Sequence, residues 1–431
     1  MIAKAMWYPN EHTIDKKGKM SRFKYSLLIC MLLMQCSDTS IQEEKAKYDT
    51  ISQHIQVIDE VPLQVKELKN LSVFQGNQEP MYTMELIPEQ SFGEPGKPGE
   101  PNLRIVEGAF VDKDRLILWD KNECCDFAAD YKAYVYNPDG SYHTQIERPS
   151  GKSGDFDFIY RVAIKGDNLI LYGSLDFFLA IYSAEDYSIR TSITWEEWTE
   201  RAIKDELGKP FSITDVRNDG NYLVASTSGF IENSRSTIQY VLVDPNGNRL
   251  DYGPLKFTSR LSISSHASSP APSRPIEIVG NSVTTLSDKD ELYEAWDQDF
   301  LIKKYDADGN YQSAIYYPVK GLPYDINEYA KKAKYKIEDL ITEDVPNTRP
   351  VISKLKVDDE NRIWVAVPKD VEHDHYEWWV LEESGELLAK LVLPEDNPIY
   401  DIKNGFLYSK KVDYKTKREF IMKYRIKLNE R

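Results

Sequence analysis

The chain has 431 residues, of which 41% are hydrophobic and 12% aromatic, a composition that is typical of a globular protein and excludes a disordered chain. Its 70 acidic and 54 basic residues give a formal net charge of −16. This charge argues against nucleic acid as a partner, because phosphate binding requires a basic surface, and against adhesion to an anionic lipid surface.

The N-terminal region has the pattern of an export signal. Lys and Arg residues between positions 16 and 24 precede an apolar run from Tyr25 to Met34. Such a run is typical of a signal peptide and is too short to span a bilayer. Met20 is a better start than Met1, because the sequence from Met20 opens like a signal peptide.

The apolar run ends at Leu33-Met34-Gln35-Cys36-Ser37-Asp38. This stretch resembles the lipobox of bacterial lipoproteins, in the relaxed form found in Bacteroidetes. The resemblance implies that residues 1–36 are a signal peptide and lipobox, and that Cys36 is lipidated and becomes the first mature residue. Met34 and Gln35 depart from the strict small-residue pattern, and an ordinary secretory peptide with a chance cysteine is the alternative. Acyl chains on Cys36 would hold the protein at a membrane while its body stays in water.

Residues 37–75 are polar and charged without a sustained apolar face, which predicts a flexible tether. Within this segment, the stretch from Ile55 to Val65 has the pattern of an isolated strand.

The stretch from Glu107 to Pro149 contains short runs of alternating or apolar residues, separated by the turn signals Asp112-Lys113-Asp114 and Asn137-Pro138-Asp139-Gly140. Alternation with period two marks strands, because it places one set of side chains on one face. Asp and Gly tolerate the positive φ of a hairpin turn. The stretch therefore predicts one blade of a β-propeller.

Similar units recur along the chain, each with an Asp, Asn or Gly turn, an apolar strand and an aromatic-rich strand. The later units begin near Ile159, Ile213, Ile276, Ile352 and Ile399. About six such units indicate a repeat architecture rather than separate domains. We therefore predict an all-β fold, a six-bladed β-propeller that spans residues 76–431.

The sixth unit ends near Leu428 without a clear fourth strand, and the early strand Tyr82–Ile87 has no blade of its own. We expect this strand to complete the last blade, because the pairing would join both ends of the propeller and remove an open edge.

A short helical insertion is predicted between blades four and five, from Asp325 to Glu343. Apolar residues recur there at helical spacing, namely Ile326, Tyr329, Ala330, Ala333 and Ile337.

Two glycine-rich stretches, Ser91–Glu100 and Pro149–Phe156, stand just before the first strands of the first two blades. They look like the loops of NHL-type propellers, where the backbone turns tightly between blades. Over roughly residues 80–429, the sequence resembles the six-bladed, NHL- or TolB-like propeller lipoproteins of Bacteroidetes. The dipeptides Trp119-Asp120 and Trp296-Asp297 occur without the Gly-His partner of WD40 blades.

Several apparent motifs do not support a catalytic or metal function. Gly151-Lys152-Ser153 lacks the earlier glycine of a phosphate-binding loop, and a strand rather than a helix is expected after it. Asp306–Asn310 resembles the start of a calcium loop but lacks the later glutamate, so a hairpin turn is predicted. His373 and His375 would share one face of a strand and are weak metal candidates, but they fall in an expected loop of blade five. We predict no metal and no cofactor.

The adjacent pair Cys124-Cys125 could form a vicinal disulfide outside the cytosol, although two reduced thiols are the favoured alternative. Tryptophans could stack on sugar rings, but core packing is the favoured role of this set, which comprises Trp195, Trp198, Trp296, Trp364, Trp378 and Trp379. Carboxylates are plentiful, and nothing in the sequence singles out a catalytic pair.

Together these features predict an exported protein at the bacterial cell envelope, lipid-anchored to the outer membrane and facing the periplasm or the surface. We expect a binding or scaffolding module rather than an enzyme, with a protein or carbohydrate partner, no nucleic acid, and membrane contact through the lipid anchor only. The alternative is a glycan-active hydrolase or lyase with carboxylates in the central channel. About three inward carboxylates clustered around the central channel would indicate the enzyme, and an aromatic or mixed polar rim without that cluster would indicate the binding module.

Overall fold

Strands make up nearly all of the regular structure. The computed structural model describes residues 56–57, 61–97, 99–122, 130–148, 156, 159, 161–173, 179–194, 197, 211–228, 235–261, 282–323, 325, 327, 331, 348–369 and 375–431. These residues belong to one unit of the chain, residues 54–431. The predicted signal peptide and lipobox, with Cys36, lie outside the described residues.

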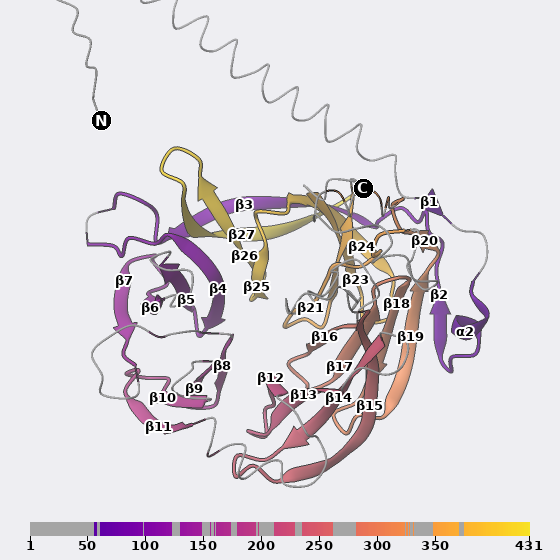
Figure 1. The fold of residues 1–431 in the computed structure, drawn as a ribbon. Helices are drawn as coiled ribbons and strands as arrows, with labels where there is room; N and C mark the ends of the chain where they lie inside the picture. The colour runs from indigo at the N-terminus through magenta and orange to yellow at the C-terminus, as the bar shows by residue number, and fades with distance from the viewer. Residues whose placement is uncertain are drawn as a thin grey trace, which may run out of the picture. The chain divides into compact units, whose positions relative to one another are not determined.

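Six antiparallel sheets are arranged around a central axis as the blades of a propeller (Figure 1). The strands of the first three blades are β4 (Ile105–Asp112), β5 (Arg115–Asn122), β6 (Asp130–Tyr136), β7 (Tyr142–Ile146); β8 (Arg161–Lys165), β9 (Asn168–Tyr172), β10 (Leu179–Ser183), β11 (Ile189–Ile193); and β12 (Phe211–Val216), β13 (Tyr222–Ser228), β14 (Arg235–Val243), β15 (Arg249–Leu261). The strands of the last three blades are β16 (Ser282–Leu286), β17 (Leu292–Trp296), β18 (Phe300–Tyr305), β19 (Tyr311–Tyr317); β21 (Lys354–Val357), β22 (Ile363–Pro368), β23 (His375–Leu381), β24 (Leu387–Pro394); and β25 (Ile399–Lys403), β26 (Phe406–Asp413), β27 (Arg418–Glu430) with β3 (Tyr82–Phe92). The predicted six-bladed propeller is confirmed.

The strands of each of the first five blades follow one another in chain order across the sheet. The first strand of every blade, β4, β8, β12, β16, β21 or β25, faces the centre of the ring (Figure 1). Side chains of these six strands therefore converge on the central axis.

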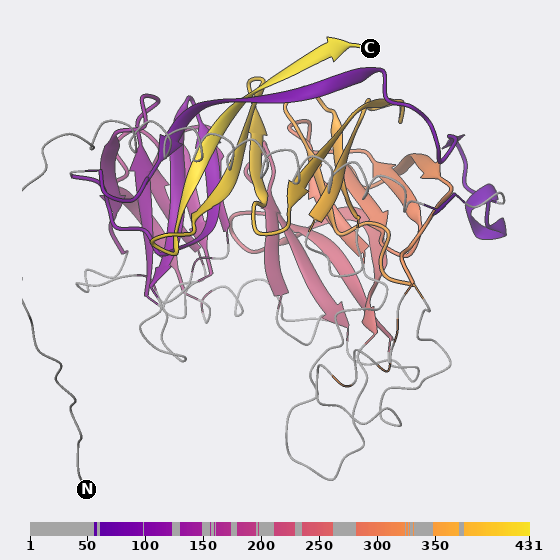
Figure 2. The ribbon, with the colours of Figure 1, turned by 90° about the horizontal axis from the view of Figure 1, so that it is seen from above.

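Strand β3 closes the ring. It pairs antiparallel with β27, from Tyr82 opposite Glu430 to Phe92 opposite Ile421, and so supplies the fourth strand of the sixth blade. Figure 2 shows the two strands, at opposite ends of the colour scale, running side by side. The prediction that an early strand completes the last blade is confirmed, and the physical reason is that pairing satisfies the backbone groups of an otherwise open edge.

The paired strands β3 and β27 also cover part of blade five. Alternate residues of β3, Tyr82, Met84 and Leu86, pack with Leu391 and Leu393 of β24. Residues Tyr424, Ile426 and Leu428 of β27 belong to the same cluster. This two-residue periodicity leaves the intervening Thr83 and Glu85 exposed, as expected for strands with one buried face.

Residues before β3 pack against the outer edge of blade four. Strand β2 (Leu71–Val73) adds in parallel to β19, and the short helix α2 (Leu63–Lys66) buries Val65 in a cluster with Tyr316. Strand β1 (Gln56–Val57) pairs with β20 (Val319–Lys320). The packed body therefore starts ahead of residue 76, which differs from the expected tether at residues 37–75. The added strand covers an exposed sheet edge, which local sequence polarity does not reveal.

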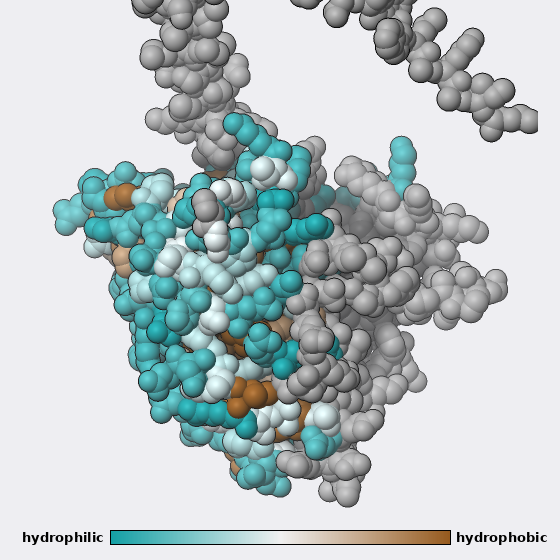
Figure 3. Space-filling model, turned by 90° about the vertical axis from the view of Figure 1, so that its left-hand side faces the viewer, coloured by the Kyte–Doolittle hydropathy of each residue, from teal (hydrophilic) through white to brown (hydrophobic). Residues whose placement is uncertain are grey.

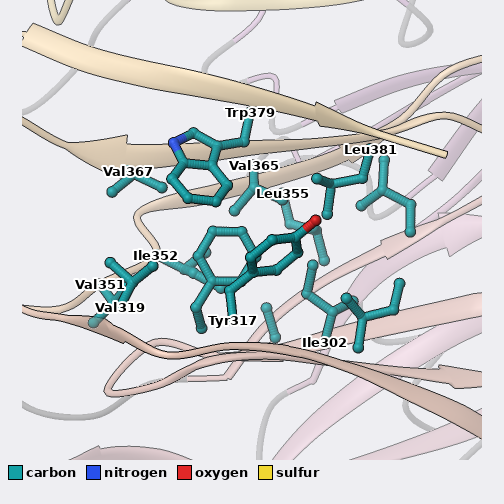
Figure 4. Close-up of a cluster of buried hydrophobic side chains, with 14 of the residues drawn as sticks. Ile302, Tyr317, Val319, Val351, Ile352, Leu355, Val365, Val367, Trp379 and Leu381 are labelled. Carbon is teal, nitrogen blue, oxygen red and sulfur yellow. The ribbon is translucent and has the colours of Figure 1, made fainter. Parts of the chain in front are cut away.

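Apolar interfaces between neighbouring blades form the core. Figure 4 shows the interface of blades four and five, where Tyr317 and Trp379 lie with ring centroids 5.3 Å apart. Phe300 packs against Trp379 at 5.0 Å, and the Tyr317 hydroxyl donates to the Gly385 carbonyl at 2.6 Å. Each blade buries both faces against its neighbours, so the hydrophobic effect supports the whole ring rather than single sheets.

The turns between the third and fourth strands of the blades contain residues with positive φ, as the sequence predicts. Gly140, Gly247, Gly309 and Gly385 have φ between 80° and 100°, which side chains rarely adopt. In the turn that resembled a calcium loop, the Asp306 carboxylate accepts from the backbone N–H groups of Asp308 and Asn310 at 3.0 and 2.8 Å. The hairpin turn predicted there is confirmed.

The helical insertion predicted at residues 325–343 lies almost wholly outside the described residues. No helix in the described part of the chain is long and apolar enough to cross a membrane. Figure 3 shows one face of the molecule, on which hydrophilic side chains predominate and hydrophobic areas are small and separate.

We expect Phe92→Ala to destabilise the protein by about 3–5 kcal/mol, because it removes a fully buried ring from the strand that closes the propeller. The Phe92 ring lies 6.1 Å from Tyr136 and 6.3 Å from Tyr408, so it joins blade six to blade one. Glu85→Ala on the exposed face of β3 is the matched control, with an expected change within about 0.5 kcal/mol. Urea unfolding measures both, and a loss below about 1 kcal/mol for Phe92→Ala would contradict the role of β3.

Candidate functional site

A cavity of about 330 Å³ lies at the centre of the ring. Every first strand contributes to its wall, which comprises Glu107, Gly108, Ala109, Phe110, Trp119, Arg161, Val162, Ala163, Ile164, Lys165, Asp215, Thr285, Leu286, Ser287, Asp288, Lys356, Val357, Asp359, Tyr400, Asp401, Ile402 and Lys403. We call this space the channel cavity. Its volume is at the lower end of the range for small-molecule sites.

The channel cavity carries charges of both signs. Its cationic side chains are Arg161, Lys165, Lys356 and Lys403, and its carboxylates are Glu107, Asp215, Asp288, Asp359 and Asp401. The wall is therefore a mixed polar surface, neither uniformly acidic nor uniformly basic.

Backbone bulges orient part of this wall. The pairing register shifts between Val106 and Gly108 in β4, between Ile213 and Asp215 in β12, and between Ile399 and Asp401 in β25. A bulge inserts one extra residue and turns the following side chain. Asp215 and Asp401 occupy equivalent positions in their strands, directly after a bulge.

Asp215 is held by blade two. Its Oδ2 accepts from the Arg161 guanidinium at 2.8 Å, and its Oδ1 accepts from the Val216 N–H at 2.9 Å. Arg161 also donates to the Thr214 carbonyl. Burial opposes the charge of Arg161, but interactions with Asp215 and Tyr172 together outweigh burial and raise the pKa of Arg161. This pair is a fixed link across two neighbouring blades.

Asp401 is held across the junction between the last and first blades. Its Oδ2 accepts from the Val111 N–H of β4 at 2.8 Å, and its Oδ1 accepts from the Ile402 N–H at 2.9 Å. Burial raises the pKa of Asp401, while the Val111 hydrogen bond and the charge of Lys356 oppose this rise. Both carboxylate oxygens are thus occupied by the backbone.

Lys356 projects into the channel cavity from β21. Its Nζ donates to the Tyr400 carbonyl at 2.8 Å. Burial lowers the pKa of Lys356 to about 8. The negative charge of Asp401 opposes this lowering, and the positive charge of Arg161 adds to it.

Further links between blades lie where the first strands end. Lys165 donates to the Asn218 side-chain oxygen at 3.0 Å, and the Asn218 N–H donates to Asp290 at 2.9 Å. The Asn404 N–H donates to Asp359 at 2.7 Å. These bonds hold the turns of neighbouring blades in a fixed arrangement around the cavity.

Three aromatic side chains, Phe110, Trp119 and Tyr400, contribute to the wall of the channel cavity. Gly108 lets the Trp119 ring pack over β4, because a Cβ on Gly108 would lie 1.9 Å from that ring. Phe110 packs with the Trp119 cluster between blades one and two, and its ring centre lies 5.9 Å from the Lys403 ammonium. Tyr400 packs in the cluster between blades six and one. A ligand with a flat apolar face could pack here while its polar groups meet the charged side chains.

The arrangement favours binding over acid–base catalysis. The cavity contains more than three carboxylates, but Asp215 is paired with Arg161, and Asp401 accepts two backbone hydrogen bonds. Asp401 has the raised pKa that a general acid requires, yet neither of its oxygens is free to donate a proton to a ligand. The carboxylates that hold neighbouring blades together are therefore poor candidates for a catalytic pair.

The structure does not bring the sequence-derived candidates into the channel cavity. Cys124, Cys125, His373 and the Gly151-Lys152-Ser153 stretch lie outside the described residues. His375 begins β23, where it pairs with Pro394. Trp364, Trp378 and Trp379 are fully buried, which confirms core packing for these three. Among the described residues, no group of three or more His, Cys, Asp or Glu side chains could hold a metal ion.

Sequence reasoning missed the channel residues, although a local signal exists. The first strands β8, β12, β21 and β25 read RVAIK, FSITDV, KLKV and IYDIK, with charged residues within or at the ends of mostly apolar runs. In a blade, such a residue has to face the axis or a neighbouring blade. The charged positions in first strands were therefore the detectable signal.

No protein-family model matches the chain, and no curated protein matches it either. Among solved structures, a candidate exported protein of Bacteroides fragilis aligns with a TM-score of 0.49 and 13% identity, covering 83% of this chain and 99% of its own. The calcium-binding protein regucalcin of Agrobacterium tumefaciens aligns with a TM-score of 0.36 and 10% identity, covering 84% and 97%. The Cps50 (Swd1) β-propeller domain of Myceliophteria thermophila aligns with a TM-score of 0.31 and 10% identity, covering 78% of this chain and 98% of its own. These likenesses carry no argument about function.

Asp120, near the end of β5, holds the start of β4, which is one of the strands that line the cavity. Its Oδ1 accepts from the N–H groups of Arg104 and Ile105, both at 2.8 Å, at the start of β4. Burial raises the pKa of Asp120 to about 6, although these two hydrogen bonds oppose the rise. The folded protein therefore binds this proton more tightly than the unfolded chain does.

We expect the stability contributed by Asp120 to be greatest below about pH 4 and to be lost as the pH rises through about 6. Asp120→Asn keeps an oxygen for both backbone N–H groups but carries no charge. Its stability relative to wild type should increase between pH 4 and pH 7, by on the order of 2–3 kcal/mol. Urea unfolding at both pH values tests this.

The control is Asp114→Asn, in the exposed turn between β4 and β5, where Asn tolerates the φ of 72°. This variant should show no comparable dependence on pH. If Asp120→Asn and wild type differed by the same free energy of unfolding at both pH values, the claim that burial destabilises the charged form of Asp120 would be contradicted.

Proposed function

We propose that this protein is an exported lipoprotein of the bacterial cell envelope, which acts as a binding or scaffolding module and binds a small polar ligand in its channel cavity. The observation that carries the binding role is the cavity itself. All six first strands contribute residues to it, among them charges of both signs, and three aromatic residues line it as well. Such a combination of apolar surface and a few oriented polar groups is typical of ligand sites.

The proposed location rests on the sequence. The basic region, the apolar run and the lipobox-like stretch before Cys36 support export and lipidation. We propose anchoring at the outer membrane through acyl chains alone, since a net charge of −16 disfavours direct contact with anionic lipids. The glycine-rich stretch at Ser91–Glu100, where Gly93, Gly96 and Gly99 have positive φ, supports a relation to NHL- or TolB-like lipoproteins.

A protein or carbohydrate partner at the envelope fits this proposal, and a nucleic acid does not. The glycan-active hydrolase or lyase remains the second candidate, because several carboxylates line the channel cavity. Glu107 and Asp288 are the carboxylates that such an enzyme would use, since Asp215 and Asp401 are held by other blades. Hydrolysis of a glycan that is lost in both Glu107→Gln and Asp288→Asn would favour this candidate.

We expect Cys36→Ser to abolish incorporation of an alkyne-labelled fatty acid when the full chain is expressed in a Bacteroidetes host. The protein should also leave the membrane fraction, because one buried acyl chain or more supplies its membrane affinity. Cys30→Ser, within the apolar run, is the matched control and should be labelled like wild type. Unchanged labelling of Cys36→Ser would contradict the lipoprotein proposal.

We expect Thr285→Trp to block ligand binding, because Thr285 of β16 lines the channel cavity and a large ring would fill it. A panel of sugars, uronic acids, amino acids and small carboxylic acids is compared by thermal unfolding. At 100 times its dissociation constant, a ligand stabilises the folded state by about 2.7 kcal/mol. At least one compound should raise the melting temperature of wild type and not of this variant.

Thr191→Trp, on the exposed edge strand β11, is the control for adding a tryptophan. It should respond to ligands like wild type. Compounds that stabilise wild type and Thr285→Trp equally would contradict binding in the channel cavity.

A further inference from the structure

Lys356 is a cation without a matching anion. It extends from β21 into the channel cavity, where its Nζ donates to one acceptor, the Tyr400 carbonyl. Among the residues that the structure describes, none places a carboxylate within ion-pair distance of this ammonium. A backbone carbonyl carries only a partial charge, so a partly buried ammonium remains undercompensated here.

The nearest negative groups are committed to other partners. Asp401 accepts from the N–H groups of Val111 and Ile402, and Asp215 pairs with Arg161. Burial and the like charges of Arg161 and Lys354 disfavour the protonated ammonium of Lys356 and lower its pKa, so an added negative group beside it would be stabilising. The charged groups on the remaining sides of the cavity are Glu107, Lys165, Asp288, Asp359 and Lys403.

The surroundings of Lys356 also indicate the size and chemical character of an anion that would fit beside it. The carbonyl that accepts from its ammonium belongs to Tyr400, whose residue lines the same cavity as Phe110 and Trp119. A cavity of about 330 Å³ accommodates a small organic molecule and not a long polymer. The complement of this cavity is an anionic group attached to a small organic body that packs against its aromatic and aliphatic lining.

We propose that the channel cavity binds a small organic carboxylate whose anionic group lies against the Lys356 ammonium. This inference rests on the proposed ligand-binding function and adds the chemical class of the ligand. A carboxylate would complete the missing ion pair in a partly desolvated site, where such a pair is stronger than at the surface. No covalent step is involved.

The test uses three carboxylates and their neutral counterparts, namely acetate with acetamide, benzoate with benzamide, and glucuronate with glucose. Affinity for the full chain is measured by titration calorimetry at pH 7. At least one carboxylate should bind at least about tenfold more tightly than its counterpart, and Lys356→Met should lose at least about tenfold in affinity for it. Lys354→Met is the matched control, because Lys354 lies on the same strand, outside the cavity wall and over the Tyr376 ring at 5.3 Å.

The dependence on pH gives a second readout. Only the protonated ammonium attracts the carboxylate, so affinity should be constant below about pH 8 and fall as the pH rises above it. Binding near pH 8 should be accompanied by proton uptake, seen as a dependence of the heat on the ionisation enthalpy of the buffer. Lys356→Arg should keep the affinity at pH 9 better than wild type, because a guanidinium stays protonated.

The inference is overturned if no carboxylate binds more tightly than its neutral counterpart, or if Lys356→Met binds the carboxylate like wild type. These outcomes are distinct from failure of the proposed function. Neutral compounds that bind wild type and not Thr285→Trp would leave a ligand-binding channel in place while removing Lys356 as an anion site. A melting curve of Lys356→Met that matches wild type shows that the variant is folded.

Discussion

The pairing of β3 with β27 is the interaction on which the rest of the structure depends. A blade buries its faces only against its two neighbours, so an open ring would leave one face of the first blade and one face of the last in water. Hydrogen bonds between β3 and β27 make the last blade from both ends of the propeller. The ring of apolar interfaces, including the cluster around Trp379, can therefore close without an exposed edge.

The channel cavity is a consequence of that closure. Three hydrogen bonds cross from blade six to blade one, from the Val106 N–H to Glu419, from the Val111 N–H to Asp401, and from the Tyr400 hydroxyl to the Val106 carbonyl. The first bond positions the start of β4, and the second removes Asp401 as a partner for Lys356. The same contacts that join the ends of the ring thus set the charge balance in its centre, which links stability to the proposed ligand binding.

Several ionised groups around the axis hold neighbouring blades together, so the number of carboxylates in the cavity does not by itself indicate a catalytic site. Asp215 with Arg161 and Asp359 with the Asn404 N–H are links between blades. Breaking such a link would leave a partly buried charge unpaired, so these side chains have little freedom to serve a reaction. Lys356 differs from them, because its one described acceptor is a carbonyl.

The sequence by itself determined the all-β class, the six units, the turns such as Asp306–Asn310 and the closure by Tyr82–Ile87, because these depend on local periodicity and on turn residues. It did not reveal that Leu71–Val73 pairs with blade four or that Gln56–Val57 pairs with β20, since an edge strand is recognised only by the strand that it meets. It also did not reveal the channel residues. Lys356, Arg161, Asp215 and Asp401 stand on four different blades, and only closure of the ring brings them to one axis, where burial and the occupied carboxylates decide which charge is left without a partner.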